Sequence, residues 1–125
     1  MVAFIDDDAF AHTDYVKHCI DFFERHPYAV AMGGKILPVY EHGSAPNWMN
    51  PYMQTLVAAQ NFGNQVRIFA KNKFPIGANM AFRKSVFDQV GKFDPDLGRK
   101  GENLEGGEEK DLFQRIRSQS GEVMY

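Results

Sequence analysis

Three consecutive carboxylates follow an apolar run in the stretch Val2-Ala3-Phe4-Ile5-Asp6-Asp7-Asp8. An uninterrupted apolar run of this kind is typical of a strand in the middle of a parallel sheet, where both faces are covered. Ligands of open α/β sheets bind at the carboxyl ends of the strands. Adjacent carboxylates repel one another, and a divalent cation relieves that repulsion. The stretch therefore predicts a buried strand that ends at a cation or a polarised ligand; a solvated turn is the alternative.

A second acidic cluster opens an amphipathic stretch near the end of the chain, in Gly106-Gly107-Glu108-Glu109-Lys110-Asp111-Leu112. Acidic residues in the first turn of a helix interact favourably with its dipole, which would explain the cluster without any chemistry. Asp111 and Arg115 have the spacing of an ion pair on one helix face. Either Glu108 or Glu109 is then left to face a cleft, where its carboxylate could act as a base.

Composition narrows the class of protein. The 125 residues are one domain or part of one, with ordinary apolar (44%) and charged (24%) fractions. A net charge of −2 predicts no nucleic-acid partner. The single cysteine, Cys19, suits a reducing compartment, and the chain lacks the features of a signal peptide or a bilayer-spanning segment. We expect a cytoplasmic protein, peripheral to the inner face of a membrane only through residues outside this chain.

Patterning along the chain predicts alternating helices and strands. Helices are expected over residues 13–25, capped by Thr13, and over 52–61, 84–90 and 107–118. Strands are expected over 2–5, 29–40, 66–70 and 76–82, with another beginning at 122 and a loop over 92–106. The first helix has an apolar stripe made of Tyr15, Val16, Cys19, Ile20, Phe22 and Phe23. The order predicts an α/β domain with a mixed sheet. Because the first and last strands look truncated, we expect residues 1–125 to be a single fragment of a larger domain.

Small residues interrupt two of the apolar segments. Gly33 and Gly34 indicate a bulge or a close approach of two backbones. In the stretch Phe74-Pro75-Ile76-Gly77-Ala78-Asn79-Met80-Ala81-Phe82, small side chains would let a ligand approach the backbone, and Asn79 can donate and accept hydrogen bonds. A bulged strand with a local Asn79 hydrogen bond is the alternative. Trp48, in a loop rich in Pro and Asn, could stack on the sugar ring of an acceptor or pack beneath the loop.

Three segments resemble, in this order, the family-2 inverting glycosyltransferases of the GT-A fold: residues 2–8, residues 77–94 and residues 107–112. The likeness covers nearly the whole chain but corresponds to the second half of a typical catalytic domain. It implies a partial GT-A, Rossmann-like domain with a mixed β-sheet flanked by helices. It also implies metal-dependent transfer of a sugar, with inversion, from a nucleotide-diphosphate-sugar to the hydroxyl of a carbohydrate or lipid-linked acceptor in cell-envelope polysaccharide synthesis.

The resemblance also implies roles for individual residues. The carboxylates of Asp6, Asp7 and Asp8 would form the DxD motif, with Asp8 and Asp6 on Mn²⁺ or Mg²⁺ and with Asp6 and Asp7 toward the donor. Residues 77–79 would line the donor-sugar pocket. The Glu108-Glu109 pair would correspond to a Glu-Asp motif whose Asp deprotonates the acceptor. Glu109 stands in place of that Asp, one methylene longer, so the base is Glu109 or Glu108.

Departures from the family pattern limit what the chain is expected to do alone. The half that holds the nucleotide base is absent, so we expect the isolated fragment to be inactive and to self-associate. Gln114 and Arg117 have the spacing of the motif of processive synthases, but Ser118 replaces its Trp. Two alternatives remain open. One is a phosphohydrolase of the haloacid dehalogenase type, although Phe10 stands where that motif wants Thr or Val. The other is a non-catalytic module that binds a carbohydrate or a partner.

Overall fold

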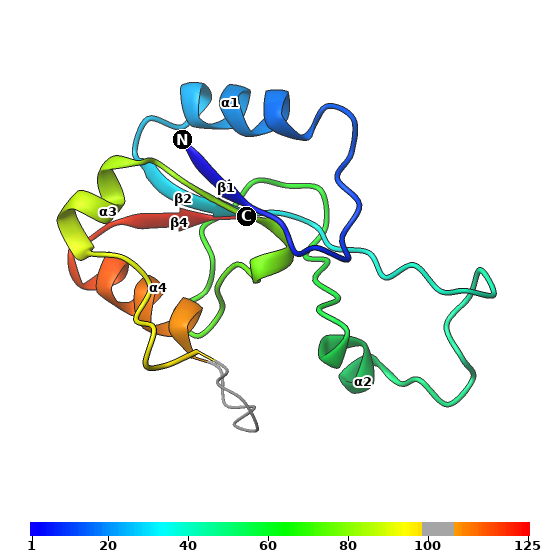
Figure 1. Cartoon of the computed structure of the whole chain (residues 1–125). Coiled ribbons are helices and arrows are strands. Elements are labelled where there is room, and N and C mark those ends of the chain that lie inside the picture. Colours follow the sequence, from blue (N-terminus) through cyan, green and yellow to red (C-terminus); the bar gives the residue numbers. More distant parts are fainter. Residues whose placement is uncertain (99–106) are drawn as a thin grey trace.

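The computed structural model describes residues 1–98 and 107–125, and within them a mixed four-stranded sheet is flanked by helices (Figure 1). The strands are β1 (Val2–Phe4), β2 (Ala29–Gly33), β3 (Met80–Phe82) and β4 (Glu122–Met124), in the spatial order β1-β3-β2-β4. Strand β3 is antiparallel to both β1 and β2, and β4 is parallel to β2. The predicted α/β domain with a mixed sheet is confirmed.

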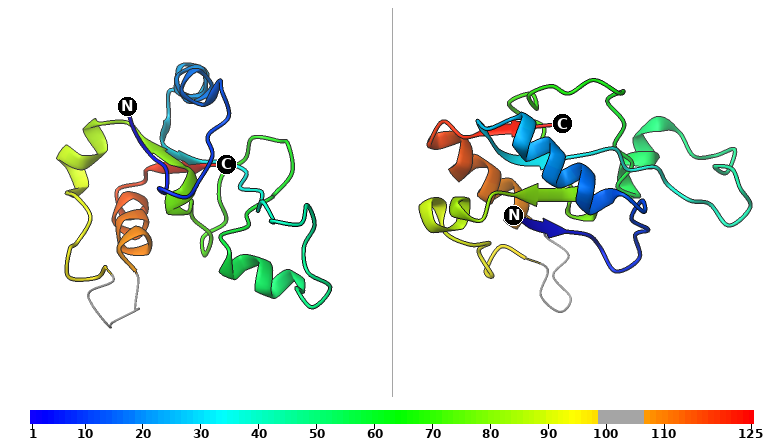
Figure 2. Two further views of the ribbon diagram at one scale, coloured as in Figure 1. Left: turned by 45° about the vertical axis from the view of Figure 1, so that its right-hand side comes forward. Right: turned by 90° about the horizontal axis from the view of Figure 1, so that it is seen from above.

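Helices cover both faces of the sheet, which gives three layers (Figure 2). Helix α1 (Tyr15–Arg25) lies on one face, and α3 (Ser85–Val90) and α4 (Glu108–Ser118) lie on the other. Side chains alternate along β3, so Ala81 packs with Cys19 and Phe23 of α1, whereas Met80 and Phe82 join the main core. That core contains Leu112, Phe113 and Ile116 from α4. Every helix of the described ranges is too short or too polar to span a bilayer.

The helices 84–90 and 107–118 are confirmed to within one residue, but two other predicted helices differ. Helix α1 begins at Tyr15 with Asp14 at its N-cap, so Thr13 is not the cap. The Asp14 N–H instead donates to Nδ1 of His12 at 3.2 Å. Helix α2 (Pro51–Leu56) is shorter than predicted, because Ala58 adopts a positive φ of 56° just beyond it. Of the predicted stripe on α1, Val16 and Ile20 are exposed.

Strand β1 differs from the expected central parallel strand. It is the outermost strand of the described sheet, it pairs antiparallel with β3, and Ala3 is exposed. Only its Val2 and Phe4 face turns inward, where the Phe4 ring packs against Phe82 and Phe93 at centroid distances of 5.8 and 5.3 Å. An apolar run of this kind predicts a strand that is buried on both faces, but within the described residues β1 is covered on one face.

Three predicted strand regions are shorter than expected. Residues 66–70 form no strand, and Ile68 makes an isolated bridge to Met124. Residues 77–79 form a 3₁₀ turn (η1, Gly77–Asn79), so β3 begins only at Met80. Strand β2 ends at Gly33, where an added Cβ would lie 2.5 Å from Pro75 Cβ. A close backbone approach therefore explains Gly33, while the register shift of β2 lies between Ala29 and Ala31. Residues 99–106 of the predicted loop lie outside the described residues.

Arg83 joins α1 to the sheet. Its Nε donates to the carbonyl of Ala29 at 2.8 Å, and Nη2 donates to the carbonyls of Phe23 (2.6 Å) and His26 (3.2 Å). The guanidinium carbon lies 5.0 Å from the centroid of the Phe23 ring. One side chain therefore satisfies carbonyls at the end of α1 and the start of β2.

We expect Arg83→Met to lower the free energy of unfolding by about 3 kcal/mol, because part-buried carbonyls lose a charged donor. Urea denaturation measures this loss. Arg25→Met is the matched control, since Arg25 is exposed and its ion pair with Asp21 is long, at 4.0 Å; it should cost less than about 0.5 kcal/mol. Equal losses in the two variants would contradict the assigned role of Arg83.

Candidate active site

A cleft of about 850 Å³ opens beyond the carboxyl end of β1. Its lining includes Asp6 and Asp8 from the loop after β1, and Ala78 and Asn79 from η1. The structure thus brings together four of the residues predicted for donor and metal binding. Asp7 does not line the cleft. Trp48 does not line it either and is 68% exposed, so it does not pack beneath its loop.

The two acidic clusters meet at Gly77. A Cβ added to Gly77 would lie 3.2 Å from Oδ1 of Asp6 and 3.2 Å from Oε1 of Glu109. These carboxylates come from opposite ends of the chain, one after β1 and the other in the first turn of α4. The missing side chain of Gly77 leaves the space in which both oxygens lie. The two acidic segments thus approach each other at a specific backbone position, although Glu109 is not among the residues that line the cleft.

The first turn of α4 gives its acidic side chains different partners. Glu108 turns back to its own helix end, where Oε2 accepts a hydrogen bond from the Gly107 N–H at 2.8 Å. Asp111 forms the expected ion pair with Arg115, at 2.7 Å between Oδ2 and Nη2. Glu109 is the acidic residue of this turn whose oxygen lies against Gly77. Geometry therefore distinguishes the two glutamates that the sequence left equivalent.

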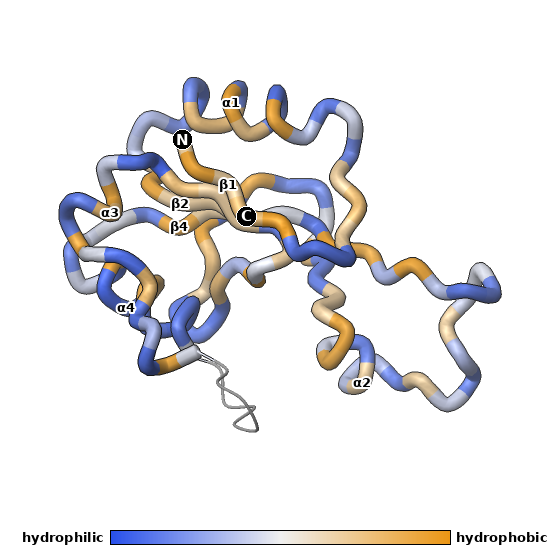
Figure 3. Tube along the Cα trace, viewed as in Figure 1, coloured by the Kyte–Doolittle hydropathy of each residue, from blue (hydrophilic) through white to orange (hydrophobic). Residues whose placement is uncertain are grey.

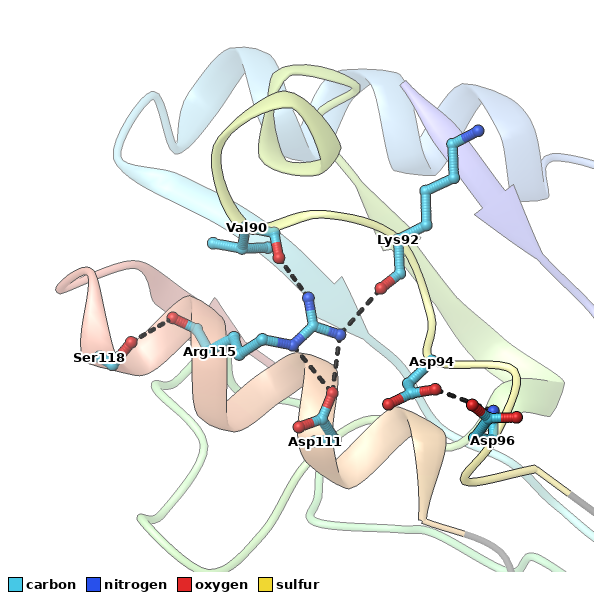
Figure 4. A network of polar contacts seen from close by, with 7 residues as sticks. All are labelled: Val90, Lys92, Asp94, Asp96, Asp111, Arg115 and Ser118. Atoms are coloured by element: carbon cyan, nitrogen blue, oxygen red, sulfur yellow. Dashed lines mark hydrogen bonds and ion pairs between the residues drawn. The ribbon is translucent and has the colours of Figure 1, made fainter.

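Two arginines hold α4 in place from opposite sides. Arg115 bonds Asp111 and donates to the carbonyls of Val90 and of Lys92, the latter at 2.8 Å (Figure 4). Arg117 donates to three carbonyls of the loop that leads to η1, those of Ala70, Lys71 and Lys73. Burial lowers the pKa of Arg117 from its ordinary value. Because both anchors lie in the same helix as Glu109, they restrict where its backbone can move relative to Gly77.

Asn79 and Lys35 connect the cleft to the chain that follows β2. Nδ2 of Asn79 donates to the carbonyl of Lys35 at 3.1 Å, and a Cβ on Gly34 would lie 2.7 Å from the same Nδ2. This hydrogen bond is not the local one considered for Asn79, because its acceptor lies 44 residues away in the chain, and Asn79 also lines the cleft. The ammonium of Lys35 reaches Oδ1 of Asn64 at 2.6 Å.

Tyr15 lies in the lining of the cleft, with Cys19 beside it on α1. Burial, with a smaller contribution from Cys19, raises the pKa of the Tyr15 phenol, and burial also raises the pKa of the Cys19 thiol. Both groups therefore stay protonated near neutral pH. Neither the phenol nor the thiol therefore suits the role of a base at that pH.

The carboxylates are compatible with a shared metal site. No group of three or more His, Cys, Asp or Glu side chains within residues 1–98 and 107–125 is placed to hold a metal ion. Mg²⁺ in phosphate-transfer sites is typically bound by one or two carboxylates and keeps waters and substrate phosphates as its other ligands. Asp6 and Asp8, which line one cleft, provide oxygens of that kind.

Much of the cleft wall consists of residues for which the sequence predicted no role in the site. These lining residues are His12, Tyr15 and Lys35, together with the apolar residues Ile5, Ala9, Phe10, Ala11, Ile36, Leu37, Pro38, Val39, Leu56, Val57 and Ala58. The sequence contains one signal for this wall: the stretch between Lys35 and Arg67 has no lysine or arginine. Large apolar residues in such an uncharged, turn-rich stretch indicate a surface that binds something.

Comparisons with known proteins place the chain among glycosyltransferases. The family model described as glycosyl transferase family 2 matches residues 1–91. A curated relative, the glucosyl-dolichyl phosphate glucuronosyltransferase of Haloferax volcanii, is 34% identical over 128 residues. That match covers 100% of this chain and 40% of the relative, so the chain spans about two fifths of the relative's length. No solved structure matches.

Proposed function

The chain belongs to glycosyl transferase family 2, and from this premise we propose that it carries the catalytic carboxylates of an inverting transferase. The enzyme would move a sugar from a nucleotide-diphosphate-sugar to an acceptor hydroxyl. The observation that carries the proposal is the convergence of Asp6 and Glu109 at Gly77, beside a cleft lined by Asp6 and Asp8. The family assignment removes the alternative of a haloacid dehalogenase-type phosphohydrolase.

Glu109 is proposed as the general base. It accepts the proton of the acceptor hydroxyl while that oxygen attacks the anomeric carbon and the bond from this carbon to the diphosphate oxygen breaks. Attack from the face opposite the leaving group inverts the configuration. A positioned base typically contributes about 10²–10⁴-fold. The Arg115 and Arg117 contacts support the proposal because they anchor the helix that carries Glu109.

The donor is proposed to bind at the carboxyl end of β1. Ala78 and Asn79 share the cleft lining with Asp6 and would contact the donor sugar, whereas Gly77 is not among the lining residues. The Asp6 and Asp8 oxygens would hold a divalent cation; when bound, it neutralises negative charge on the diphosphate. Asp7, outside the lining, would reach the donor only from the edge of the cleft.

A lipid-linked acceptor and a larger catalytic domain complete the proposal. The Haloferax volcanii relative is named as a glucuronosyltransferase of glucosyl-dolichyl phosphate, which favours an acceptor of that class here. We also propose that this chain is the second half of the catalytic domain. The 40% share of the relative's length supports this, as does β1, whose outer edge has no partner strand among the described residues.

The test is a transfer assay on the whole protein that contains this chain. UDP-glucuronate and UDP-glucose are offered as radiolabelled donors, with a glucosyl polyprenyl phosphate and a soluble glucoside as acceptors. We expect label in an acceptor, and proton NMR should show an anomeric configuration opposite to that of the donor. A product that retains the donor configuration would overturn the inverting mechanism. Donor binding without transfer to either acceptor would favour a non-catalytic binding module.

We expect Asp8→Ala to weaken Mn²⁺ binding, measured by calorimetry with a nucleoside diphosphate present, by about tenfold or more. Replacing even an outer partner of a metal site costs about 10–100-fold, so a direct ligand should cost at least as much. Glu24→Ala, an exposed acidic position on α1, is the control for the lost charge. Equal affinities in wild type and Asp8→Ala would remove Asp8 from the metal site.

A further inference from the structure

A long arm, residues 36–60, leaves the sheet after β2 and projects from the body of the molecule (Figures 1 and 3). Its two ends are tied together by reciprocal backbone hydrogen bonds between Ile36 and Gln60, at 2.8 and 3.1 Å. Helix α2, on the returning side of the arm (Figure 1), has no buried residue. The large apolar side chains that the arm exposes are Leu37, Val39, Trp48, Tyr52, Met53, Leu56 and Val57.

The arm is almost without charge. From Lys35 to Arg67 no lysine or arginine intervenes, and Glu41 is the single acidic residue, in a chain with 24% charged residues. Solvated segments are normally rich in charge, and a large exposed apolar surface usually marks a binding site. Segments that lie on anionic membranes use lysine and arginine for attraction to the headgroups. The arm lacks these residues, which favours an uncharged apolar ligand over a bilayer surface.

The apolar surface of the arm continues into the candidate active site. Leu37 and Val39 on its outgoing side and Leu56 and Val57 on its returning side line the same cleft as Asp6 and Asp8. Lys35 lies where the arm begins, also in the cleft lining. The cleft therefore combines carboxylates, an ammonium and an apolar wall. A sugar linked through phosphate to an isoprenoid chain carries hydroxyl groups, an anion and a hydrocarbon in that order. These three parts match the carboxylates, the ammonium and the apolar wall of the cleft.

We propose that the arm binds the isoprenoid chain of a lipid-linked acceptor, with the acceptor phosphate at Lys35 and its sugar toward Glu109. The proposal rests on the proposed transferase function. Lys35 bonds Asn64 through one of the three donors of its ammonium, and the other donors can reach a phosphate. The hydrocarbon lies between Leu37 and Val39 on one side and the returning segment of the arm on the other.

Trp48 provides a reporter inside the arm, because it is the single tryptophan of the chain and is 68% exposed. Farnesyl phosphate, added to the full chain below its critical micelle concentration, should shift the Trp48 emission to the blue with saturation. Geranyl phosphate should bind about tenfold more weakly, because one isoprene unit less is buried. Inorganic phosphate should cause no shift. Equal affinities for the two prenyl phosphates would overturn the proposal.

Exposed residues allow variants that leave the core intact. Val39→Ser and Leu56→Ser replace side chains that are 82% and 73% exposed, and each should weaken farnesyl phosphate binding by about tenfold. Val16→Ser and Tyr28→Ser are the matched controls, since both residues are exposed and lie outside the cleft. They should bind as the wild type does, and similar losses in the arm and control variants would overturn the proposal.

Other occupants give different results, and each of them overturns the proposal. An equal Trp48 shift with phosphatidylglycerol vesicles that lack prenyl phosphate would assign the arm to a bilayer surface. A shift that depends on protein concentration without lipid, with a matching rise in light scattering, would assign it to a second copy.

If farnesyl phosphate does not bind but the whole protein glycosylates a soluble glucoside, this inference fails and the transferase function stands. If farnesyl phosphate binds but no acceptor is glycosylated, this inference stands and the transferase function fails.

Discussion

Glu109→Gln should reduce transfer by the whole protein about 10²–10⁴-fold, the usual contribution of a general base. The amide keeps the size of the side chain beside Gly77 but cannot take the acceptor proton. Donor affinity should stay within about twofold, because the donor is held by other contacts and a change confined to the transition state appears in kcat. Steady-state kinetics and calorimetric titration with the donor measure the two quantities separately.

Glu108→Gln is the matched control for this prediction. The two residues are neighbours in the same helical turn, yet Glu108 accepts a hydrogen bond from Gly107, which a glutamine oxygen can also accept. Its transfer rate should therefore stay within about threefold of the wild type. Near-normal turnover of Glu109→Gln together with a large loss in Glu108→Gln would identify Glu108 as the base.

The sequence predicted the elements whose ends carry local signals. Helix α3 ends where expected because Gly91 takes a φ of 80°, a conformation that favours glycine. Helix α4 combines acidic residues in its first turn with an apolar face made of Leu112, Phe113 and Ile116. In both cases the local preference and the tertiary environment agree, so the pattern was sufficient.

The errors lie where partners distant in the sequence decide the structure. Residues 66–70 have the composition of a strand, yet they form only an isolated bridge from Ile68 to Met124, although the Phe69 N–H also donates to the carbonyl of Val123 at 2.9 Å. The apolar run of β1 reads as central, but an alternating and a doubly buried strand are hard to distinguish over such a short length. Pairing geometry, which depends on β3, determined that only the Val2 and Phe4 face is covered.

The site was predicted in its residue types and not in its shape. Asp6, Ala78 and Asn79 were expected to bind the donor and Asp8 the metal, and all four line one cleft. Which glutamate faces Gly77 depends on the rotation of α4, which the anchoring of Arg115 and Arg117 restricts. The arm was not predicted because most of its apolar residues fall in segments whose patterns predict a strand (29–40) and a helix (52–61). These residues form part of the cleft wall because the tertiary structure brings the two sides of the arm together, which the sequence pattern does not show.

Gly77→Ala should lower kcat/KM of the whole protein by about 10–100-fold, because small displacements of reacting groups are costly. The added methyl would lie 3.2 Å from one oxygen of Asp6 and 3.2 Å from one oxygen of Glu109, so each carboxylate must move by a few tenths of an ångström. Folding should be unaffected or slightly stabilised, by less than about 1 kcal/mol, since alanine restricts the unfolded chain. Gly98→Ala, where an added Cβ meets no atom within 4 Å, should leave transfer unchanged.

A second substitution tests whether the loss comes from crowding of Glu109. Glu109→Asp withdraws the carboxylate by one methylene, and in the Gly77→Ala background that withdrawal makes room for the new methyl. We expect Glu109→Asp to reduce kcat/KM less in that background than in the wild type, which is a coupling between neighbouring groups. Purely additive losses would mean that Gly77 and Glu109 act separately, and the convergence of the two acidic segments would then have no part in catalysis.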